Sequence, residues 1–114
     1  MSLLSSILEI FSKPDTTIVR LNREAFKNHT SGKKVQLIDV RTTVEFKSGH
    51  IKGSKNIDFY NRSQFLTQIQ KLNKEKPVYL YCRSGMRSYR AAKTLKKLGF
   101  KEIYDLKGGI LNWK

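Results

Sequence analysis

The sequence predicts an α/β fold with a mostly parallel central sheet of about five strands. Two short, mostly apolar runs, Val35–Val40 and Val78–Tyr81, have the composition of strands buried on both faces of a parallel sheet. Segments with helical spacing separate such runs, and strands that alternate with helices indicate parallel β-α-β units with right-handed crossovers. Ligands of these sheets bind beyond the carboxyl ends of the strands, so the residues that follow each run are the first candidates for a site.

The first half of the chain is expected to supply three strands and two helices. The strands are predicted at Thr17–Val19, Val35–Val40 and Lys55–Ile57. Asn22 is expected to cap the helix after the first strand, and Thr42 or Thr43 to begin the short helix after the second. Gly49 is expected to end that short helix.

The second half is expected to supply two helices and two strands. Gln64–Leu72 is amphipathic and predicts a helix, and Pro77 opens the Val78 strand. Ser88 is a good N-cap for the next helix, whose apolar face holds Ala91, Ala92, Leu95 and Leu98. Ile103–Leu106 predicts the last strand, and a turn follows that ends at Trp113.

Residues 1–15 are predicted to form an N-terminal extension, and residues 16–114 a single domain. A short amphipathic helix is expected in the extension, with an apolar face of Leu4, Ile7, Leu8 and Phe11. Lys13–Asp15 has the composition of a linker. We favour packing of this helix on its own domain, and docking on a partner or a membrane surface is the alternative. The segment does not resemble a secretory signal, because no basic residue leads it and Glu9 interrupts it.

Composition limits the classes of function. The chain has 114 residues, 39% of them hydrophobic and 28% charged, which is typical of one globular domain. No apolar run is long enough to span a membrane. The single cysteine excludes an intramolecular disulfide and an internal resolving thiol, and it is compatible with a reducing cytoplasm. The two histidines are scattered, which argues against a metal site.

The formal net charge is +14. A solvated basic surface is the favoured interpretation, and attraction of small oxyanions, an acidic protein or RNA is the alternative. Aromatic residues do not alternate with basic residues in a recognisable motif, so nucleic acid is a weak candidate partner that the charge leaves open. The sequence does not indicate an oligomeric state.

The segment Cys82–Ser88 joins a predicted strand to a predicted helix and carries the clearest chemical signal. A short loop that contains Gly85 and leads into a helix points several backbone N–H groups into one concavity. The helix N-terminus and the charges of Arg83 and Arg87 add positive potential there, which favours a Cys82 thiolate. The alternative is that Cys82 is a small buried apolar residue at a strand end.

The loop Cys82-Arg83-Ser84-Gly85-Met86-Arg87-Ser88 resembles the active-site loop of the rhodanese-like sulfurtransferases. A second segment, from Leu37-Ile38-Asp39-Val40-Arg41 to Gly49-His50-Ile51-Lys52-Gly53-Ser54, resembles the N-terminal signature of the same family. The closing Gly108-Gly109 and Trp113 resemble its last segment, so the likeness covers residues 16–113. The resemblance implies a three-layer rhodanese-like fold with helices on both faces of the sheet.

The resemblance also implies a function, which is transfer of a sulfane sulfur from an anionic donor such as thiosulfate to a thiol or cyanide through a Cys82 persulfide. A protein persulfide is a further candidate partner, and no cofactor or metal is expected. The residues expected to bind the donor are Arg83, Ser84, Gly85, Met86, Arg87 and Ser88. The alternatives are a non-catalytic binding module, or a phosphatase or arsenate reductase on the same scaffold. Dual-specificity phosphatase domains of this fold have one residue more between Cys and Arg, so the shorter loop favours sulfur transfer.

Four further residues are expected to support the site. Asp39 and Arg41 either hold an anion or brace the strand-to-helix turn, and we favour the brace. Arg41 and Glu45 are four residues apart and can pair across one helical turn. His50 is expected to be a hydrogen-bonded, half-buried imidazole in a turn, with a role as a catalytic base as the alternative.

Overall fold

The computed structural model describes residues 15–113. The expected helix at the N-terminus lies outside these residues and stays a prediction. The elements are β1 (Ile18–Leu21), α2 (Arg23–Thr30), β2 (Gln36–Asp39), α3 (Thr43–Lys47), β3 (Lys55–Asn56), α4 (Arg62–Ile69), β4 (Val78–Tyr81), α5 (Met86–Lys97), β5 (Ile103–Leu106) and a 3₁₀-helix (Ile110–Asn112).

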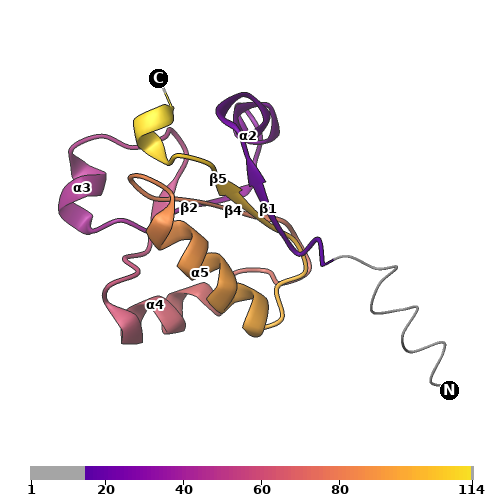
Figure 1. Cartoon of the computed structure of the whole chain (residues 1–114). Helices are drawn as coiled ribbons and strands as arrows, with labels where there is room; N and C mark the ends of the chain where they lie inside the picture. The colour runs from indigo at the N-terminus through magenta and orange to yellow at the C-terminus, as the bar shows by residue number, and fades with distance from the viewer. Residues whose placement is uncertain (1–14, 114) are drawn as a thin grey trace, which may run out of the picture.

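The five strands form one parallel sheet in the order β1-β5-β4-β2-β3, which confirms the predicted α/β fold. β4 lies at the centre of this order, and its four residues are all buried. Figure 1 shows α2 on one side of the sheet and α4 and α5 on the other, so helices cover both faces. Because all five strands are parallel, their carboxyl ends lie at one edge of the sheet, and the segments after β2, β4 and β5 meet there.

Side chains alternate between the two faces of the sheet and form two apolar clusters. On the side of α4 and α5, Val78, Leu80 and Cys82 pack with the apolar residues of these helices. On the side of α2, Tyr79 and Tyr81 pack with Phe26 and, at its edge, Trp113. Cys82 thus continues the inward pattern of β4 and faces α5.

Local capping chemistry explains where two of the helices begin. The Asn22 side chain accepts a hydrogen bond from the Ala25 backbone N–H at 2.8 Å, which confirms the expected cap of α2. Thr42 caps α3 in a reciprocal arrangement in which Glu45 reaches back to the Thr42 backbone N–H. The choice between Thr42 and Thr43 is therefore settled in favour of Thr42.

Two predicted helix boundaries are wrong. Helix α4 covers Arg62–Ile69 rather than Gln64–Leu72. Helix α5 begins at Met86, because Gly85 has a φ of +103° and turns the chain into the helix three residues before the predicted start. Ser88 is therefore not the N-cap but a fully buried residue in the first turn. Within residues 15–113, no helix combines the length and hydrophobicity that crossing a membrane requires.

Candidate active site

Cys82 directly follows β4, and only 1% of its surface is exposed. Its Sγ accepts a hydrogen bond from the Gly85 backbone N–H at 3.1 Å and one from the Ser88 hydroxyl at 3.4 Å. Both donors belong to the start of α5, whose N-terminus carries a partial positive charge. The sulfur thus lies where negative charge is stabilised by three separate features of the fold.

Gly85 is held from the opposite side by Arg20 of β1. Arg20 Nη2 donates to the Gly85 carbonyl at 3.3 Å, and Arg20 Nε donates to Asp105 Oδ2 at 3.2 Å. A Cβ at position 85 would lie 2.9 Å from Arg20 Nη2, and φ is positive there. The position therefore requires glycine both for its backbone conformation and for the approach of Arg20.

The segment after β5 braces the back of the loop. The backbone N–H of Ile110 donates to the Cys82 carbonyl at 2.9 Å, and that of Leu111 donates to the Arg83 carbonyl at 3.2 Å. Gly109 makes this contact possible, because a Cβ there would lie 2.3 Å from the Arg83 carbonyl oxygen. The loop backbone is thereby fixed by hydrogen bonds from a segment far along the chain.

Arg87 lies beside the loop and is paired with Glu45 of α3. Nη1 and Nη2 donate to the two carboxylate oxygens at 2.6 Å and 2.8 Å, and the guanidinium lies 5.1 Å from the centre of the Tyr60 ring. The hydrogen bonds from Arg87 lower the pKa of Glu45 to about 2, and those to Glu45 raise the pKa of Arg87 above its usual range.

Asp39 and Arg41 form a buried ion pair at the end of β2. Arg41 Nη2 donates to Asp39 Oδ2 at 2.7 Å and to the Gly49 carbonyl at 2.7 Å. Burial opposes the charge of Arg41, but the hydrogen bonds with Asp39 outweigh it and raise the pKa of the arginine. Asn56 donates to the carbonyls of both residues, at 3.0 Å and 2.8 Å. This arrangement braces the turn between β2 and α3. Arg41 pairs with Asp39, and Glu45 pairs with Arg87, so the suggested Arg41–Glu45 pair is wrong.

His50 is exposed rather than half-buried as predicted. Its Nδ1 lies 2.9 Å from the Phe46 carbonyl oxygen, and its ring stacks on the Phe46 ring with centroids 3.8 Å apart. The expected hydrogen bond is present, but local packing on α3 holds the imidazole, and the structure records no contact between His50 and Cys82.

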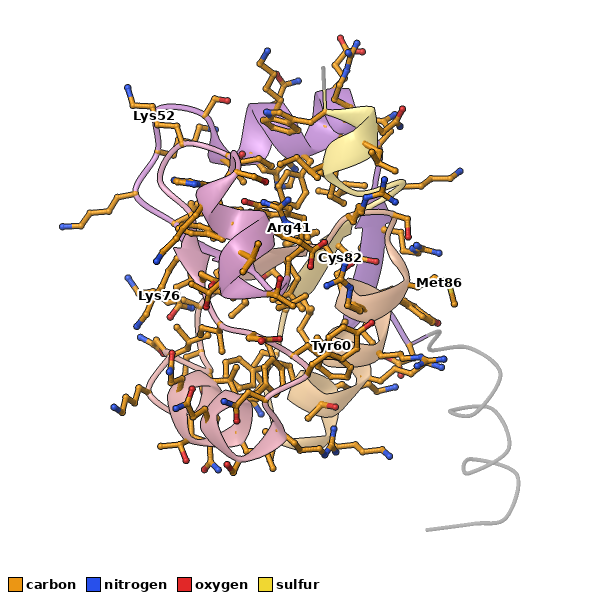
Figure 2. All side chains as sticks on the ribbon, turned by 90° about the vertical axis from the view of Figure 1, so that its left-hand side faces the viewer. Arg41, Lys52, Tyr60, Lys76, Cys82 and Met86 are labelled. Carbon is orange, nitrogen blue, oxygen red and sulfur yellow. The ribbon has the colours of Figure 1, made fainter. Side chains whose placement is uncertain are left out.

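The remaining loop residues are exposed. Arg83 and Ser84 face solvent, and the Met86 side chain is 67% exposed. Three other large apolar side chains, Val44, Tyr60 and Leu111, are also exposed. Val44 directly precedes Glu45 in α3, and the Tyr60 ring faces the Arg87 guanidinium. The Leu111 backbone N–H donates to the Arg83 carbonyl. Figure 2 shows Tyr60 and Met86 on the same side of the molecule as Cys82. We call these four side chains the apolar rim.

Asp105 and Arg20 belong to this site, and neither was predicted from the sequence. Asp105 is fully buried on β5, and its Oδ1 has no hydrogen-bond partner among the described residues. Burial raises the pKa of Asp105 to about 6, although interactions with Ser88 and Arg20 lower it. An acidic residue inside the apolar strand Ile103–Leu106 is the sequence signal that could have indicated it.

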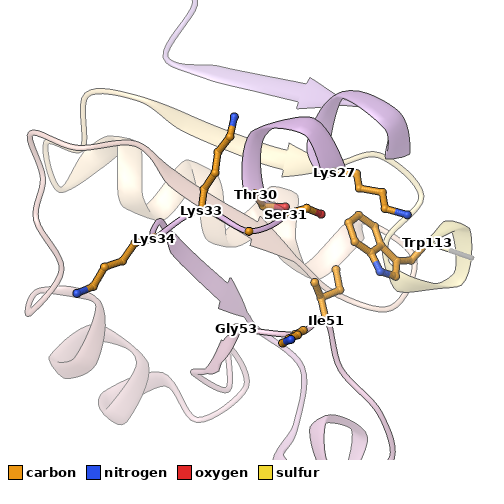
Figure 3. Close-up of a pocket in the computed structure, with 10 residues that line it drawn as sticks. Lys27, Thr30, Ser31, Lys33, Lys34, Ile51, Gly53 and Trp113 are labelled. Atoms are coloured by element: carbon orange, nitrogen blue, oxygen red, sulfur yellow. The ribbon is translucent and has the colours of Figure 1, made fainter.

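A cavity lies elsewhere, beyond the end of α2. It has a volume of about 600 Å³ and is lined by residues that include Trp113 and the four lysines Lys27, Lys33, Lys34 and Lys52. Figure 3 shows the Trp113 indole beside Lys27 and Ile51. Cys82 and its loop do not line this cavity. In the part of the chain that the structure describes, no three His, Cys, Asp or Glu side chains gather into a group that can hold a metal ion.

Comparisons with known proteins agree with this geometry. The model of the rhodanese-like domain matches residues 22–114. The crystal structure of a rhodanese-like domain protein from Staphylococcus aureus superposes with a TM-score of 0.72 at 27% identity, over 83% of this chain and 90% of that one. Thiosulfate sulfurtransferase GlpE of Shewanella oneidensis is 34% identical over 84 residues, which cover 74% of this chain and 80% of that protein.

Two further relatives are longer than the region they share with this chain. The uncharacterized protein YqhL of Bacillus subtilis is 51% identical over 81 residues, 71% of this chain and 62% of that protein. The tRNA uridine(34) hydroxylase of Pelagibacter ubique is 41% identical over 81 residues, and the chain spans only 27% of its length. Since the family model covers most of the chain and thiosulfate sulfurtransferase GlpE matches over most of its own length, this chain belongs to the rhodanese-like domain family.

Proposed function

We propose that this protein is a sulfurtransferase that moves a sulfane sulfur from an anionic donor to a thiol or cyanide through a persulfide on Cys82. The observation that carries the proposal is the pair of hydrogen bonds to Cys82 Sγ, 3.1 Å from the Gly85 N–H and 3.4 Å from the Ser88 hydroxyl. Hydrogen bonds to a charged acceptor stabilise it by about 1.5–3 kcal/mol each. The same donors can hold the anionic sulfur before and after each displacement.

The reaction consists of two displacements. With thiosulfate as donor, the Cys82 thiolate attacks the outer sulfur, a bond forms between the two sulfurs, and the S–S bond of the donor breaks. Sulfite leaves with the bonding electron pair, and Cys82 carries a persulfide anion. An acceptor thiolate then attacks the terminal sulfur, and Cys82 departs as the thiolate. Electrons and charge balance in each step, so no cofactor is needed.

Arg87 is the residue best placed to bind the donor. A guanidinium has five N–H donors, and Glu45 occupies one on each of Nη1 and Nη2. Three N–H groups remain for the oxygens of an anion at the mouth of the loop. Glu45 thereby fixes the orientation of Arg87, and a fixed donor stabilises developing charge without reorganisation.

The apolar rim supports a thiol acceptor that approaches from outside. Cys82 is buried, and no second cysteine exists in the chain, so the persulfide sulfur is discharged to another molecule. Val44, Tyr60, Met86 and Leu111 are between 61% and 79% exposed. They offer an apolar contact surface around the mouth, which suits the surroundings of a protein cysteine as well as a small thiol.

The remaining assignments follow from this function. A single cysteine that must stay reduced suits the cytoplasm. Residues 16–114 form the catalytic domain and residues 1–15 its extension. A non-catalytic binding module is disfavoured because Cys82, Arg87 and two hydrogen-bond donors to the sulfur are all present. A phosphatase is disfavoured because its phosphate needs a wider loop. Nucleic acid is a weaker candidate partner, supported only by the charge of +14.

Steady-state assays separate these classes. The proposal predicts thiocyanate formation from thiosulfate and cyanide by the wild-type protein, and no hydrolysis of an aryl phosphate or reduction of arsenate. Phosphate release at a comparable rate would assign the site to phosphoryl chemistry. Absence of both activities with every sulfane donor tested would favour the binding module.

A further inference from the structure

The loop that holds the Cys82 sulfur is fixed in two halves by two different segments. Two backbone N–H groups of the segment after β5 bind the carbonyls of Cys82 and Arg83, which belong to the first half. These contacts end two residues before Gly85, whose N–H donates to Cys82 Sγ at 3.1 Å. The second half of the loop, which carries this donor, is therefore held by other contacts.

Arg20 holds the second half of the loop from β1, at the edge of the sheet. Its Nη2 donates to the Gly85 carbonyl at 3.3 Å, and that carbonyl also accepts the Tyr89 backbone N–H at 3.3 Å. A Cβ at position 85 would lie 2.9 Å from the same Nη2, so the approach of Arg20 depends on the glycine. Arg20 thus ties the carbonyl of Gly85 to the sheet.

Asp105 sets the direction in which Arg20 points. The two residues are register partners on β1 and β5, so their side chains leave the sheet on the same face. Arg20 Nε donates to Asp105 Oδ2 at 3.2 Å, and the centre of the Tyr89 ring lies 5.0 Å from the guanidinium. The Arg20 side chain is 44% exposed, so without these contacts it would gain entropy by extending into water.

The stability of the fold does not explain why an acid is buried at position 105. The Asp105 side chain is fully buried, and its Oδ1 has no hydrogen-bond partner among the described residues. Replacement of a buried ion pair by apolar residues is often neutral or stabilising. The contact that Asp105 Oδ2 does make is the one with Arg20, which in turn binds Gly85.

We propose that Arg20 and Asp105 are positioning residues that keep the Gly85 N–H directed at the Cys82 sulfur and so favour the thiolate. Arg20 holds Gly85 through its carbonyl, and Asp105 keeps the guanidinium in place. The hydrogen bonds to the sulfur come from Gly85 and Ser88, so Arg20 and Asp105 act through the loop. A hydrogen bond to the charged form of a group favours its ionisation. This role rests on the proposed function, in which Cys82 is the reacting thiol.

The charges of the two residues provide a way to separate positioning from simple electrostatics. Arg20 and Asp105 have opposite charges, so their direct influences on the thiolate have opposite signs. Positioning predicts the same sign for both, because the loss of either releases the loop. The other charged groups around the loop are Arg87, which is paired with Glu45 of α3, and the exposed Arg83. Burial raises the pKa of Asp105 to about 6, so its carboxylate is mostly ionised above that pH.

The test is a pH titration of the thiolate by its ultraviolet absorbance, in wild type, Arg20→Met, Arg20→Lys, Asp105→Ala and Arg90→Met. The signal belongs to Cys82 because the chain has one cysteine, and the same protein with Cys82→Ser serves as the blank for the tyrosines. Arg90 is exposed on α5, so Arg90→Met controls for the loss of one arginine charge. No sulfur donor is present, so the outcome does not depend on whether the protein transfers sulfur.

Arg20→Met, Arg20→Lys and Asp105→Ala are each expected to raise the midpoint of the thiolate titration by about 0.5–1 pH unit relative to wild type. Arg90→Met is expected to leave it unchanged, because an exposed charge is screened. Arg20→Lys is grouped with the other two because an ammonium keeps the charge but lacks the planar fork that binds Asp105 and Gly85 together.

Two results would overturn the proposal. A lowered midpoint in Asp105→Ala, or an Arg20→Lys variant that titrates like wild type, would show that charge alone acts on the thiolate. Unchanged midpoints in all three folded variants would show that the pair only joins β1 to β5. Circular dichroism verifies folding, and the two Arg20 variants decide the outcome if Asp105→Ala does not fold.

Discussion

Arg87 and Glu45 are joined by two parallel hydrogen bonds of 2.6 Å and 2.8 Å, although they lie 42 residues apart in the chain. Glu45 belongs to α3 and Arg87 to the first turn of α5, so the pair links the segment after β2 to the reactive loop after β4. It fixes the planar guanidinium of Arg87 at the start of α5 and leaves three of its N–H groups for a substrate.

Replacing Arg87 by lysine should slow persulfide formation from thiosulfate by about ten- to a hundredfold in kcat/KM, or about 1.4–3 kcal/mol. Lysine keeps the charge but loses the planar fork that binds Glu45 and an oxyanion together. Arg83→Lys, at an exposed position, is the matched control and should cost less. Rapid-quench measurement of the first step is required, so that a slow acceptor step does not hide the difference. Equal losses in the two variants would refute this ranking.

Glu45→Gln should reduce the free energy of unfolding at pH 7 by about 1–2 kcal/mol, discounted for the partial exposure of the pair. The folded-state pKa of Glu45 is about 2, below its ordinary value of 4.5, because Arg87 donates to it. The contribution of Glu45 to the free energy of unfolding is present above pH 4.5 and is lost as the pH falls toward 2. Denaturant titrations of both proteins should therefore converge in acid, and a difference that grows on acidification would contradict the assignment.

Asp105→Asn should show the opposite dependence on pH. The folded-state pKa of Asp105 is about 6, above its ordinary 3.8, mainly because of burial. Its favourable contribution is fully present below pH 3.8 and is lost as the pH rises through 6, by about 3 kcal/mol at 1.36 kcal/mol per pKa unit. The stability of the Asn variant relative to wild type should thus increase between pH 4 and pH 8. If the difference stays constant over this range, the carboxylate is not strained by burial.

Gly109→Ala should destabilise the fold by about 2–4 kcal/mol and impair the loop. The added Cβ would lie 2.3 Å from the Arg83 carbonyl oxygen and 2.7 Å from that of Cys82, and φ is +64°. Gly32→Ala is the control, because Gly32 has a similar φ of +67° but nothing within 4 Å of the added Cβ. It should cost only the backbone strain, about 1–2 kcal/mol. Equal costs for the two variants would show that the brace behind the loop yields easily.

Local patterns were sufficient to predict the architecture. The apolar run of Val78–Tyr81 and the Asn22 cap depend on neighbours in the sequence, and both are as predicted. The start of α5 was misplaced because two signals compete there, a serine suited to capping and a glycine that can adopt positive φ. The glycine prevails because its own N–H donates to Cys82 Sγ and its positive φ turns the chain into the helix, and this requirement is tertiary.

The site was only partly predictable for the same reason. The pattern of Cys82, Gly85 and Arg87 lies in one short segment and is visible in the sequence. The partner of Arg87 is not, because parallel strands bring α3 beside α5 only in the folded sheet, and helical spacing favoured a pair with Arg41 instead. Asp105 enters the site through the register of β5 with β4, which no sequence periodicity specifies.

The central claim is that Cys82 carries the transferred sulfur, and intact-mass measurement after exposure to thiosulfate tests it most directly. Wild type should gain the mass of one sulfur atom, and this gain should be removed by cyanide with formation of thiocyanate. Cys82→Ser, which keeps a small polar side chain at the buried position, should remain folded and gain nothing. Sulfur uptake and turnover by folded Cys82→Ser, or a wild-type protein that gains no sulfur from thiosulfate or any persulfide donor, would contradict the account.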